Sequence, residues 1–212
     1  MTKRSLKTIQ LTVYGRDTAM GLKGFVGSYQ VNRIRRKMIP VSMTFPSVLL
    51  RPKHVLVCLP SGLRELTLVK QFLPAIGQLF KPADITLLSM PGIQLADMYP
   101  RRGFQILSPT VDQLTWTGLP RKSYLEHLQT YKFDAVLDLN LEQSLFISTV
   151  LLNFPEALRI GRGNHLGDPY YNLEIKTRYL RDERNIYRSL LETLSRLMNK
   201  EIEGLTSHST TR

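Results

Sequence analysis

From residue 53 onward, short apolar runs alternate with longer segments of helical periodicity, and this alternation constrains the fold more than any other feature. The first run, Val55 to Leu59, is continuous and apolar, and Pro60-Ser61-Gly62 ends it. Apolar residues at helical spacing then follow through Phe72. Strands buried on both faces have this continuous apolar character, and they occur in parallel sheets that helices cover. The sequence therefore predicts an α/β fold: a single Rossmann-like three-layer domain with a mostly parallel sheet.

The rest of the chain repeats the same alternation. Further strands are predicted at 83–89, 103–107, 132–140 and 157–161, with 170–176 as a sixth strand or a covering loop. Helices are predicted at 120–131, with Pro120 as the first helical residue, at 142–154, and at 178–198. The last helix carries one apolar stripe, which consists of Ile186, Leu190, Leu191, Leu194 and Leu197. Its arginine-rich remainder is expected to face water.

Positive charge is concentrated before the predicted sheet. The chain has a net charge of +12, and eleven basic residues against one acidic residue precede His54. We therefore divide the sequence into a basic N-terminal extension (1–50), a Rossmann-like domain (51–199) and a disordered Ser/Thr-rich tail (200–212). The extension contains one candidate strand, 8–14, and a candidate helix, 24–38. That helix can lie on an anionic membrane or pack on the flank of the domain.

The sequence gives no indication of several classes of function. The one cysteine, Cys58, lies inside an apolar strand, which predicts an inert buried thiol and a reducing compartment. The four histidines show no metal-ligand spacing, so neither a metal nor a cofactor is expected. No apolar run reaches the length of a membrane span, and the first residues lack a signal-peptide core. We expect a cytoplasmic protein, peripheral at the inner face of the membrane if the extension binds lipid.

The order of the motifs resembles a known family. The turn at 53–62, the strand Phe133-Asp-Ala-Val-Leu-Asp-Leu-Asn140, Arg159-Ile-Gly161, Tyr171-Asn172 and the segment 183–191 are similar to the amino-terminal domain of glycosyltransferase family 9. This family comprises the heptosyltransferases of lipopolysaccharide assembly. The resemblance implies half of a GT-B architecture: the first of two Rossmann-like domains holds the acceptor, and the second mainly holds the nucleotide-sugar donor. The chain ends where that second domain would begin.

The sequence departs from the family at two places. The family usually has Gly-Asp after the first strand, and this Asp is thought to activate the acceptor hydroxyl, whereas here Leu63 follows Gly62. Leucine cannot accept a proton. Glu65 is two positions on, about 200° away on a helix. After the fourth strand the family often has a basic phosphate-binding residue, and here Glu142-Gln-Ser144 stands instead. Both the base and a phosphate partner are expected to be missing.

The remaining candidates for ligand binding follow the predicted strands. Asp138 and Asn140 stand at the carboxyl end of a strand, where they can bind sugar hydroxyls or cap the next helix. Ser61 and Gly62 can cradle an anion at a helix start or simply reverse the chain. The final two candidates come from the resemblance, and they are Arg159 and Gly161. Asp138 and Glu65 are the weak candidates for a replacement base.

Three functions are compatible with these observations. The first is a degenerate heptosyltransferase-like half domain without catalysis, which binds a glycan, a phosphosugar or a protein partner in cell-envelope glycan metabolism. The second is an active glycosyltransferase with an ADP-sugar donor, completed by another chain or by homodimerisation. The third is a nucleic-acid-binding protein that uses the basic extension. We rank it last, because the extension has few aromatic residues for base stacking and the domain behind it is nearly neutral.

Overall fold

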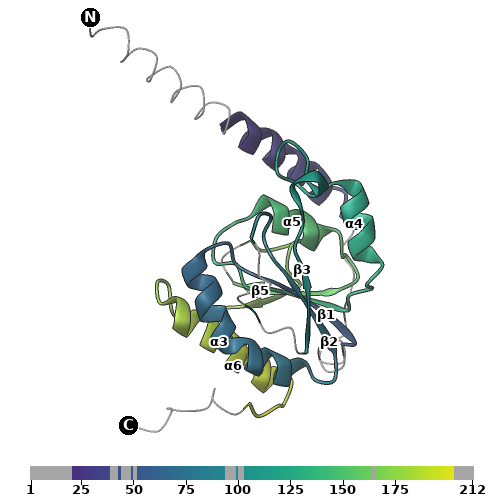
Figure 1. Cartoon of the computed structure of the whole chain (residues 1–212). Coiled ribbons are helices and arrows are strands. Elements are labelled where there is room, and N and C mark those ends of the chain that lie inside the picture. Colours follow the sequence, from purple (N-terminus) through teal and green to yellow (C-terminus); the bar gives the residue numbers. More distant parts are fainter. Residues whose placement is uncertain are drawn as a thin grey trace, which may run out of the picture.

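The chain forms a three-layer α/β domain with one helix from the N-terminal extension packed against it (Figure 1). We describe a computed structural model, in which residues 21–38, 43, 49, 52–93, 99, 103–163 and 166–202 are placed well enough for description. The candidate strand at 8–14 lies outside these residues. The predicted tail, 200–212, lies outside them from residue 203 onward.

A single parallel sheet forms the middle layer. Its order is β3-β2-β1-β4-β5-β6, and every neighbouring pair is parallel. The strands are β1 (His54–Cys58), β2 (Asp84–Leu88), β3 (Phe104–Leu107), β4 (Ala135–Asp138), β5 (Leu158–Arg162) and β6 (Leu173–Ile175). The predicted α/β fold is therefore confirmed, and the 170–176 segment contains a sixth strand. Each observed strand falls within or one residue outside the predicted range.

Alternate residues of β1 enter two different cores, which explains why this strand is apolar throughout. Val55 and Val57 join the core beneath α3 (Leu63–Phe80) and α6 (Glu183–Leu197). Leu56 and Cys58 join the opposite core, beneath α4 (Lys122–Gln129) and α5 (Leu145–Leu152). Helices thus cover both faces of the sheet. Figure 1 shows α3 and α6 on one face, with α4 and α5 on the other.

Several details of the helix predictions are wrong. The predicted helices 142–154 and 178–198 begin later in the structure, at Leu145 and Glu183. Pro120 does not begin a helix: it forms an isolated bridge with Leu114, and α4 starts two residues later at Lys122. Leu197 is 46% exposed, although it belongs to the predicted apolar stripe of α6. Tyr187 is instead 1% exposed and lies in the core beneath this helix. A residue at the end of a helix can extend beyond the sheet, and periodicity does not reveal where the packed surface ends.

Residues 21–35 form a helix that lies on the flank of the domain. Val31 is 2% exposed and belongs to the core beneath α5. A Cβ built at Gly27 would lie 3.1 Å from the Leu145 side chain, so this glycine permits close approach to the start of α5. The Arg35 guanidinium lies 5.8 Å from the centre of the Tyr170 ring. These contacts correspond to the flank-packing interpretation of the extension.

The described residues after α6 continue to pack on the domain. Lys200 Nζ donates hydrogen bonds to the carbonyl oxygens of Leu79 and Lys81, at 2.7 and 2.9 Å. Ile202 is 1% exposed and belongs to the core beneath α3. Across the described residues, no helix is both long enough and apolar enough to cross a membrane.

Candidate functional site

The strand order reverses direction between β1 and β4, and ligands of open parallel sheets bind at such a switch point. Two segments leave the sheet side by side here. One is the turn 59–62, which leads from β1 into α3. The other is the loop 139–144, which leads from β4 into α5. We call this region, defined by residues 59–62 and 139–144, the crevice, after the place where ligands of this fold class bind. The predicted residues Ser61, Gly62, Asp138 and Asn140 lie in or directly beside these two segments.

The turn after β1 opens α3 without a catalytic side chain. The Glu65 carboxylate folds back to accept a hydrogen bond from the Gly62 amide at 3.2 Å, and it thereby caps the helix. Leu63 is the first residue of α3, and its side chain is 70% exposed. Ser61 is exposed as well. Because the first amides of a helix have no acceptor within it, this turn offers hydrogen-bond donors to the crevice.

Carboxylates gather around the start of α3. Partial burial raises the pKa of Glu65, and the neighbouring charges of Glu183 and Glu142 raise it further. The Gly62 amide and the Arg64 guanidinium act in the opposite direction. Arg64 Nε lies 3.2 Å from Glu183 Oε2 at the start of α6. Three carboxylates, Glu65, Glu142 and Glu183, therefore lie near the start of α3, and Arg64, Arg181 and Arg184 lie on the side toward α6, where they line the neighbouring pocket.

Asp138 is the buried centre of the site. It is 2% exposed at the end of β4, and it faces Cys58 of β1 in the register of the sheet. Its Oδ1 accepts hydrogen bonds from the backbone N and side-chain Nδ2 of Asn140, at 3.0 and 2.7 Å. Its Oδ2 accepts a hydrogen bond from the Tyr171 hydroxyl at 2.7 Å. The carboxylate is thus engaged by protein donors on both oxygens.

Gly161 makes room for the tyrosine that contacts Asp138. A Cβ built at Gly161 would overlap the ring of Tyr171. The ring lies flat against the backbone of β5 because of this missing Cβ, and its hydroxyl reaches across to β4. Burial raises the pKa of Tyr171 strongly, and the Asp138 charge raises it further, so the hydroxyl stays protonated and remains a donor.

Arg159 also has a structural position. It is 4% exposed, and its guanidinium donates to three backbone carbonyl oxygens, those of Phe154, Pro169 and Tyr170, at 2.8 to 3.1 Å. Its backbone amide donates to the side chain of Asn172 at 2.6 Å. Burial lowers the pKa of this arginine, and nearby Asp168 raises it. Arg159 therefore joins the end of α5 to the loop before β6.

The structure thus separates the predicted site residues into two groups. Ser61, Gly62 and Asn140 line or adjoin the crevice, whereas Asp138, Arg159 and Gly161 take part in buried contacts that hold β4, β5 and the loop before β6 together. Sequence reasoning missed the role of Tyr171. It stands in a motif noted for the resemblance, but a contact that links residues 33 positions apart leaves no local signal.

The loop after β4 shows what replaces a basic phosphate ligand. Ser144 Oγ accepts a hydrogen bond from the Ile147 amide at 3.3 Å and so caps α5. Glu142 and Gln143 are exposed. Glu142 is the exposed carboxylate of this loop, and its charge reaches Glu65 across the crevice. The sequence had identified Glu142 only as a substitution for a basic residue.

The described residues contain neither a cluster of metal ligands nor an accessible thiol. No group of three or more metal-ligating side chains occurs among the residues that the structure describes. Cys58 is fully buried, and burial together with the Asp138 charge raises its thiol pKa well above the usual value. A buried thiol with a raised pKa is a poor nucleophile and a poor ligand.

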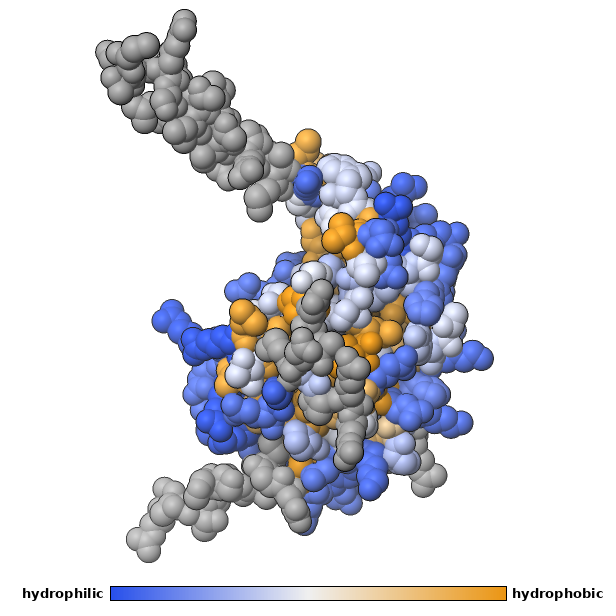
Figure 2. Space-filling model, in the orientation of Figure 1, coloured by the Kyte–Doolittle hydropathy of each residue, from blue (hydrophilic) through white to orange (hydrophobic). Residues whose placement is uncertain are grey.

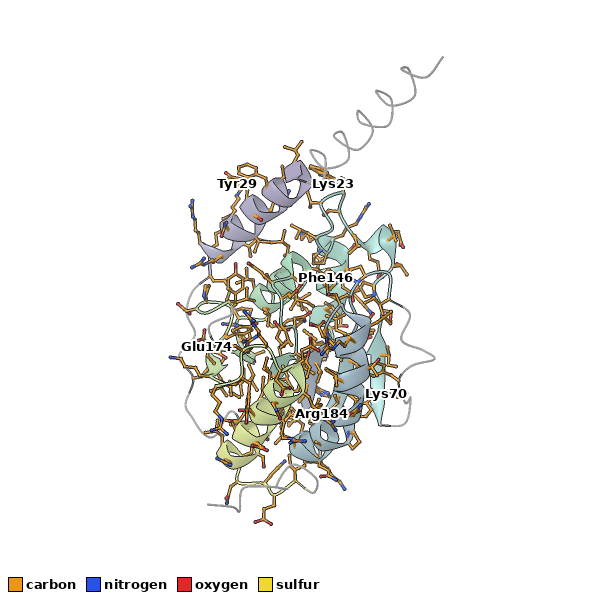
Figure 3. All side chains as sticks on the ribbon, turned by 90° about the vertical axis from the view of Figure 1, so that its left-hand side faces the viewer. Lys23, Tyr29, Lys70, Phe146, Glu174 and Arg184 are labelled. Carbon is orange, nitrogen blue, oxygen red and sulfur yellow. The ribbon has the colours of Figure 1, made fainter. Side chains whose placement is uncertain are left out.

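Surface pockets occur at both ends of the strands. A pocket of about 630 Å³ lies beside the crevice, between the starts of α3 and α6, and Arg64, Thr67 and Arg184 line part of it. Arg184 is at the front of α6 in Figure 3. A pocket of about 750 Å³ lies at the opposite end, near Asp134 and Glu156. This is the amino end of the strands, away from the crevice, where ligands of this fold class do not usually bind.

Comparison with solved structures identifies a likeness to a glycosyltransferase. E. coli heptosyltransferase WaaC with ADP matches with a TM-score of 0.50 and 15% sequence identity, over 70% of this chain and 48% of that chain. The likeness is one of fold. E. coli heptosyltransferase WaaC with ADP-2-deoxy-2-fluoro heptose gives a TM-score of 0.48 and 14% identity, over 70% and 49% of the two chains. The present chain spans about half the length of these structures.

No protein-family model matches the sequence, and no curated protein matches it. The likeness to WaaC supports a GT-B-like glycosyltransferase fold for this chain, with its Rossmann-like sheet. Residue roles have to come from the geometry of this chain itself.

Proposed function

We propose that this chain is a GT-B-type domain that binds a glycan in the crevice and does not catalyse sugar transfer by itself. One observation carries the proposal: the first residue of α3, where the resembling family has its base, is Leu63, with an apolar side chain that is 70% exposed. A leucine at this position can contact the apolar face of a sugar ring, but it cannot accept a proton from a hydroxyl.

The two replacement bases considered from the sequence are engaged elsewhere. The Glu65 carboxylate caps α3 through the Gly62 amide. The Asp138 carboxylate accepts hydrogen bonds from Tyr171 and Asn140 and is 2% exposed. A general base must reach the proton that it removes. Asp138 is shielded by burial and by these donors, and Glu65 is held against the start of α3, which argues against catalysis by either residue.

The charges at the rim favour a neutral, hydroxyl-rich ligand over a phosphorylated one. Glu142 and Glu183 lie near enough for their charges to raise the pKa of Glu65, and Arg64 pairs with Glu183, whereas Arg181 and Arg184 line the pocket toward α6 rather than the loop 139–144. A phosphate would be repelled by this arrangement, whereas carboxylates and backbone amides can bind sugar hydroxyls. We therefore prefer a glycan over a phosphosugar or a nucleotide sugar. That it comes from the cell envelope follows from the resemblance alone.

The proposal is tested by combining a transfer assay with binding measurements on the purified full-length chain. We expect no release of ADP from an ADP-sugar donor in the presence of a lipopolysaccharide core oligosaccharide. In ¹⁵N NMR spectra, titration with the unphosphorylated oligosaccharide is expected to shift the amides of residues 61–64 and 140–143. Titration with ADP is expected to leave them in place. Saturable ADP binding at these amides would overturn the ligand assignment.

The same assay addresses the alternative of an active transferase. Transfer by the purified chain that is lost in Glu142→Gln would make the exposed carboxylate of the β4–α5 loop the base, and the non-catalytic proposal would be wrong. Gln143→Ala, at the adjacent exposed position, is the matched control. Transfer that survives both substitutions would place the base outside this loop and would equally contradict the proposal.

A further inference from the structure

The helix at 21–35 presents two different faces. Gly27 and Val31 are buried against the domain. At about 100° per residue, Leu22, Phe25 and Tyr29 lie on the opposite side of the helix. They are 61, 73 and 65% exposed. Figure 3 shows Tyr29 on the side of the helix that points away from the domain.

Two arginines lie on the same outer face, near the C-terminal end of the helix. Arg33 and Arg36 are exposed and follow Tyr29 at helical spacing, so the five residues 22, 25, 29, 33 and 36 fall within about 80° of the helix circumference. We call these five residues the outer stripe. The segment 21–38 contains five basic residues and no acidic one. The face opposite the packed one therefore carries an apolar stripe with a basic end, and this face is exposed to solvent.

Ile34 is a further exposed apolar residue of this helix, and other exposed apolar residues elsewhere on the domain are Leu63, Val111, Trp116, Leu180 and Leu197. Val111 and Leu180 are 78 and 77% exposed, and neither belongs to a helical stripe. Single exposed apolar residues are ordinary, whereas a stripe of three on one helix face indicates a contact surface. In the space-filling view, hydrophobic residues lie next to hydrophilic ones at the upper part of the described surface (Figure 2).

We propose that the outer stripe is a docking surface for an anionic lipid bilayer. Leu22, Phe25 and Tyr29 would enter the boundary between headgroups and acyl chains, with the helix lying parallel to the membrane. Arg33 and Arg36 would bind the lipid phosphates. Charge complementarity identifies the occupant: a helix with cations and no carboxylate matches an anionic surface, and aromatic side chains beside these cations suit the bilayer interface.

The outer stripe contains no group of the crevice, although the buried face of its helix contacts Leu145, which directly follows the crevice loop 139–144. The helix packs on α5 and on the loop at Thr117, whose side chain lies 3.7 Å from a Cβ built at Gly27. The crevice lies at the starts of α3 and α5, and its ligand groups belong to the domain alone. Membrane binding would bring the domain to a bilayer without using any group of the proposed glycan site.

Vesicle binding by the full-length chain tests the proposal. Vesicles of phosphatidylcholine alone are compared with vesicles that contain equal parts of phosphatidylcholine and phosphatidylglycerol. The chain has a single tryptophan, Trp116, which is 60% exposed and adjoins Thr117 in the loop that contacts the helix. Co-sedimentation measures binding, and Trp116 fluorescence provides a second readout. We expect binding to the anionic vesicles and at least about tenfold weaker binding to the neutral ones.

Two double variants separate the apolar and the charged parts of the stripe. Phe25→Ser with Tyr29→Ser, and Arg33→Glu with Arg36→Glu, are each expected to weaken binding to anionic vesicles about tenfold or more. Both variants keep the basic residues of segment 1–20. Matched controls on other surfaces, Val111→Ser with Leu180→Ser and Lys70→Glu with Arg196→Glu, are expected to bind like the unchanged chain. Circular dichroism checks that each variant keeps its fold.

Three results would overturn the proposal. Equal binding to both kinds of vesicle, or binding to neither, would exclude an anionic bilayer as the occupant. Binding to a DNA or RNA duplex that persists in the Phe25→Ser, Tyr29→Ser variant and exceeds vesicle binding at the same salt would assign the cations to nucleic acid. Self-association that the stripe variants abolish, without vesicle binding, would make the surface an interface between two copies of the chain.

Discussion

At the scale of single residues, the buried contacts around Asp138 explain several motifs at once. Gly161 leaves space for Tyr171, and Tyr171 donates to Asp138. Asn140 donates to the other oxygen of the same carboxylate. Residues that sequence reasoning had assigned to a ligand therefore hold β4, β5 and the loop before β6 in place. Their energetic effect can be measured without knowing any ligand.

Gly161→Ala is expected to destabilise the fold by about 2 to 3 kcal/mol, because the added Cβ would overlap the Tyr171 ring and force the ring out of its position. Urea denaturation measures the change in the free energy of unfolding. Gly77→Ala is the control: its Cβ would make an ordinary 3.6 Å contact with Phe104, and alanine favours a helix interior. The control is expected to gain about 0.5 to 1 kcal/mol. Equal effects of the two substitutions would contradict the proposed role of Gly161.

Tyr171→Phe is expected to lower the free energy of unfolding by about 2 kcal/mol, because a buried carboxylate would lose a donor. Tyr187→Phe removes an equally buried hydroxyl, which donates to the neutral carbonyl of Leu139 at 3.1 Å. That substitution is expected to cost about 1 kcal/mol. Urea titrations of the two variants supply the comparison. A larger loss in Tyr187→Phe would show that the contact with Asp138 is not the stronger one.

Glu65 gives a pH dependence. Its pKa is raised in the folded chain, chiefly by burial, so the folded state binds this proton more tightly than the unfolded state does. The free energy of unfolding therefore increases as the pH falls through the raised pKa of Glu65 toward the ordinary glutamate range. Glu65→Gln keeps an acceptor for the Gly62 amide and removes the charge. We expect this variant to be at least as stable as the unchanged chain at neutral pH, and its relative advantage to shrink in acid.

The measurement is urea unfolding of both proteins at several pH values between neutral and mildly acidic. Glu192→Gln is the matched control, because it removes one carboxylate charge from a partly buried position of α6, away from Glu65. An advantage of Glu65→Gln that grows as the pH falls would have the wrong sign and would contradict the raised pKa.

At the scale of elements, one arginine connects segments that have no strand pairing with each other. Arg159 lies on β5, and its guanidinium reaches the end of α5 and the loop before β6. A planar guanidinium donates in several fixed directions, whereas an ammonium group is a single point. The element connections on this side of the sheet therefore depend on the shape of the side chain as well as on its charge.

Arg159→Lys is expected to destabilise the domain by about 2 to 3 kcal/mol, because at least one buried carbonyl would lose its donor. Hydrogen exchange is expected to increase most at the amides of 170–173. Arg162→Lys, three positions along the same strand and only partly buried, is expected to change stability by less than about 0.5 kcal/mol. An unchanged exchange pattern in Arg159→Lys would show that the loop is held by other contacts.

At the scale of the whole molecule, periodicity predicted the α/β layers and the strands because the four inner strands, β2, β1, β4 and β5, are short runs of mostly buried residues. The same reasoning placed Pro120 in a helix and Leu197 in a core, since the edge of a packed surface depends on distant elements. Burial of Cys58 followed from its strand. The contact between the Asp138 carboxylate and Tyr171 could not be predicted from the sequence, because it depends on the pairing of β4 with β5 in three dimensions.

The strand order has a consequence for how this chain folds as it is synthesised. β1 lies between β2 and β4, and the Asp134 carboxylate accepts from the His54 amide across 80 positions of sequence. A ribosome would have to release the chain well beyond residue 138 before β1 has both neighbours. Until then one edge of an apolar strand is open to other chains. Nascent chains that stall before β4 are thus expected to need a chaperone more than those that stall after it.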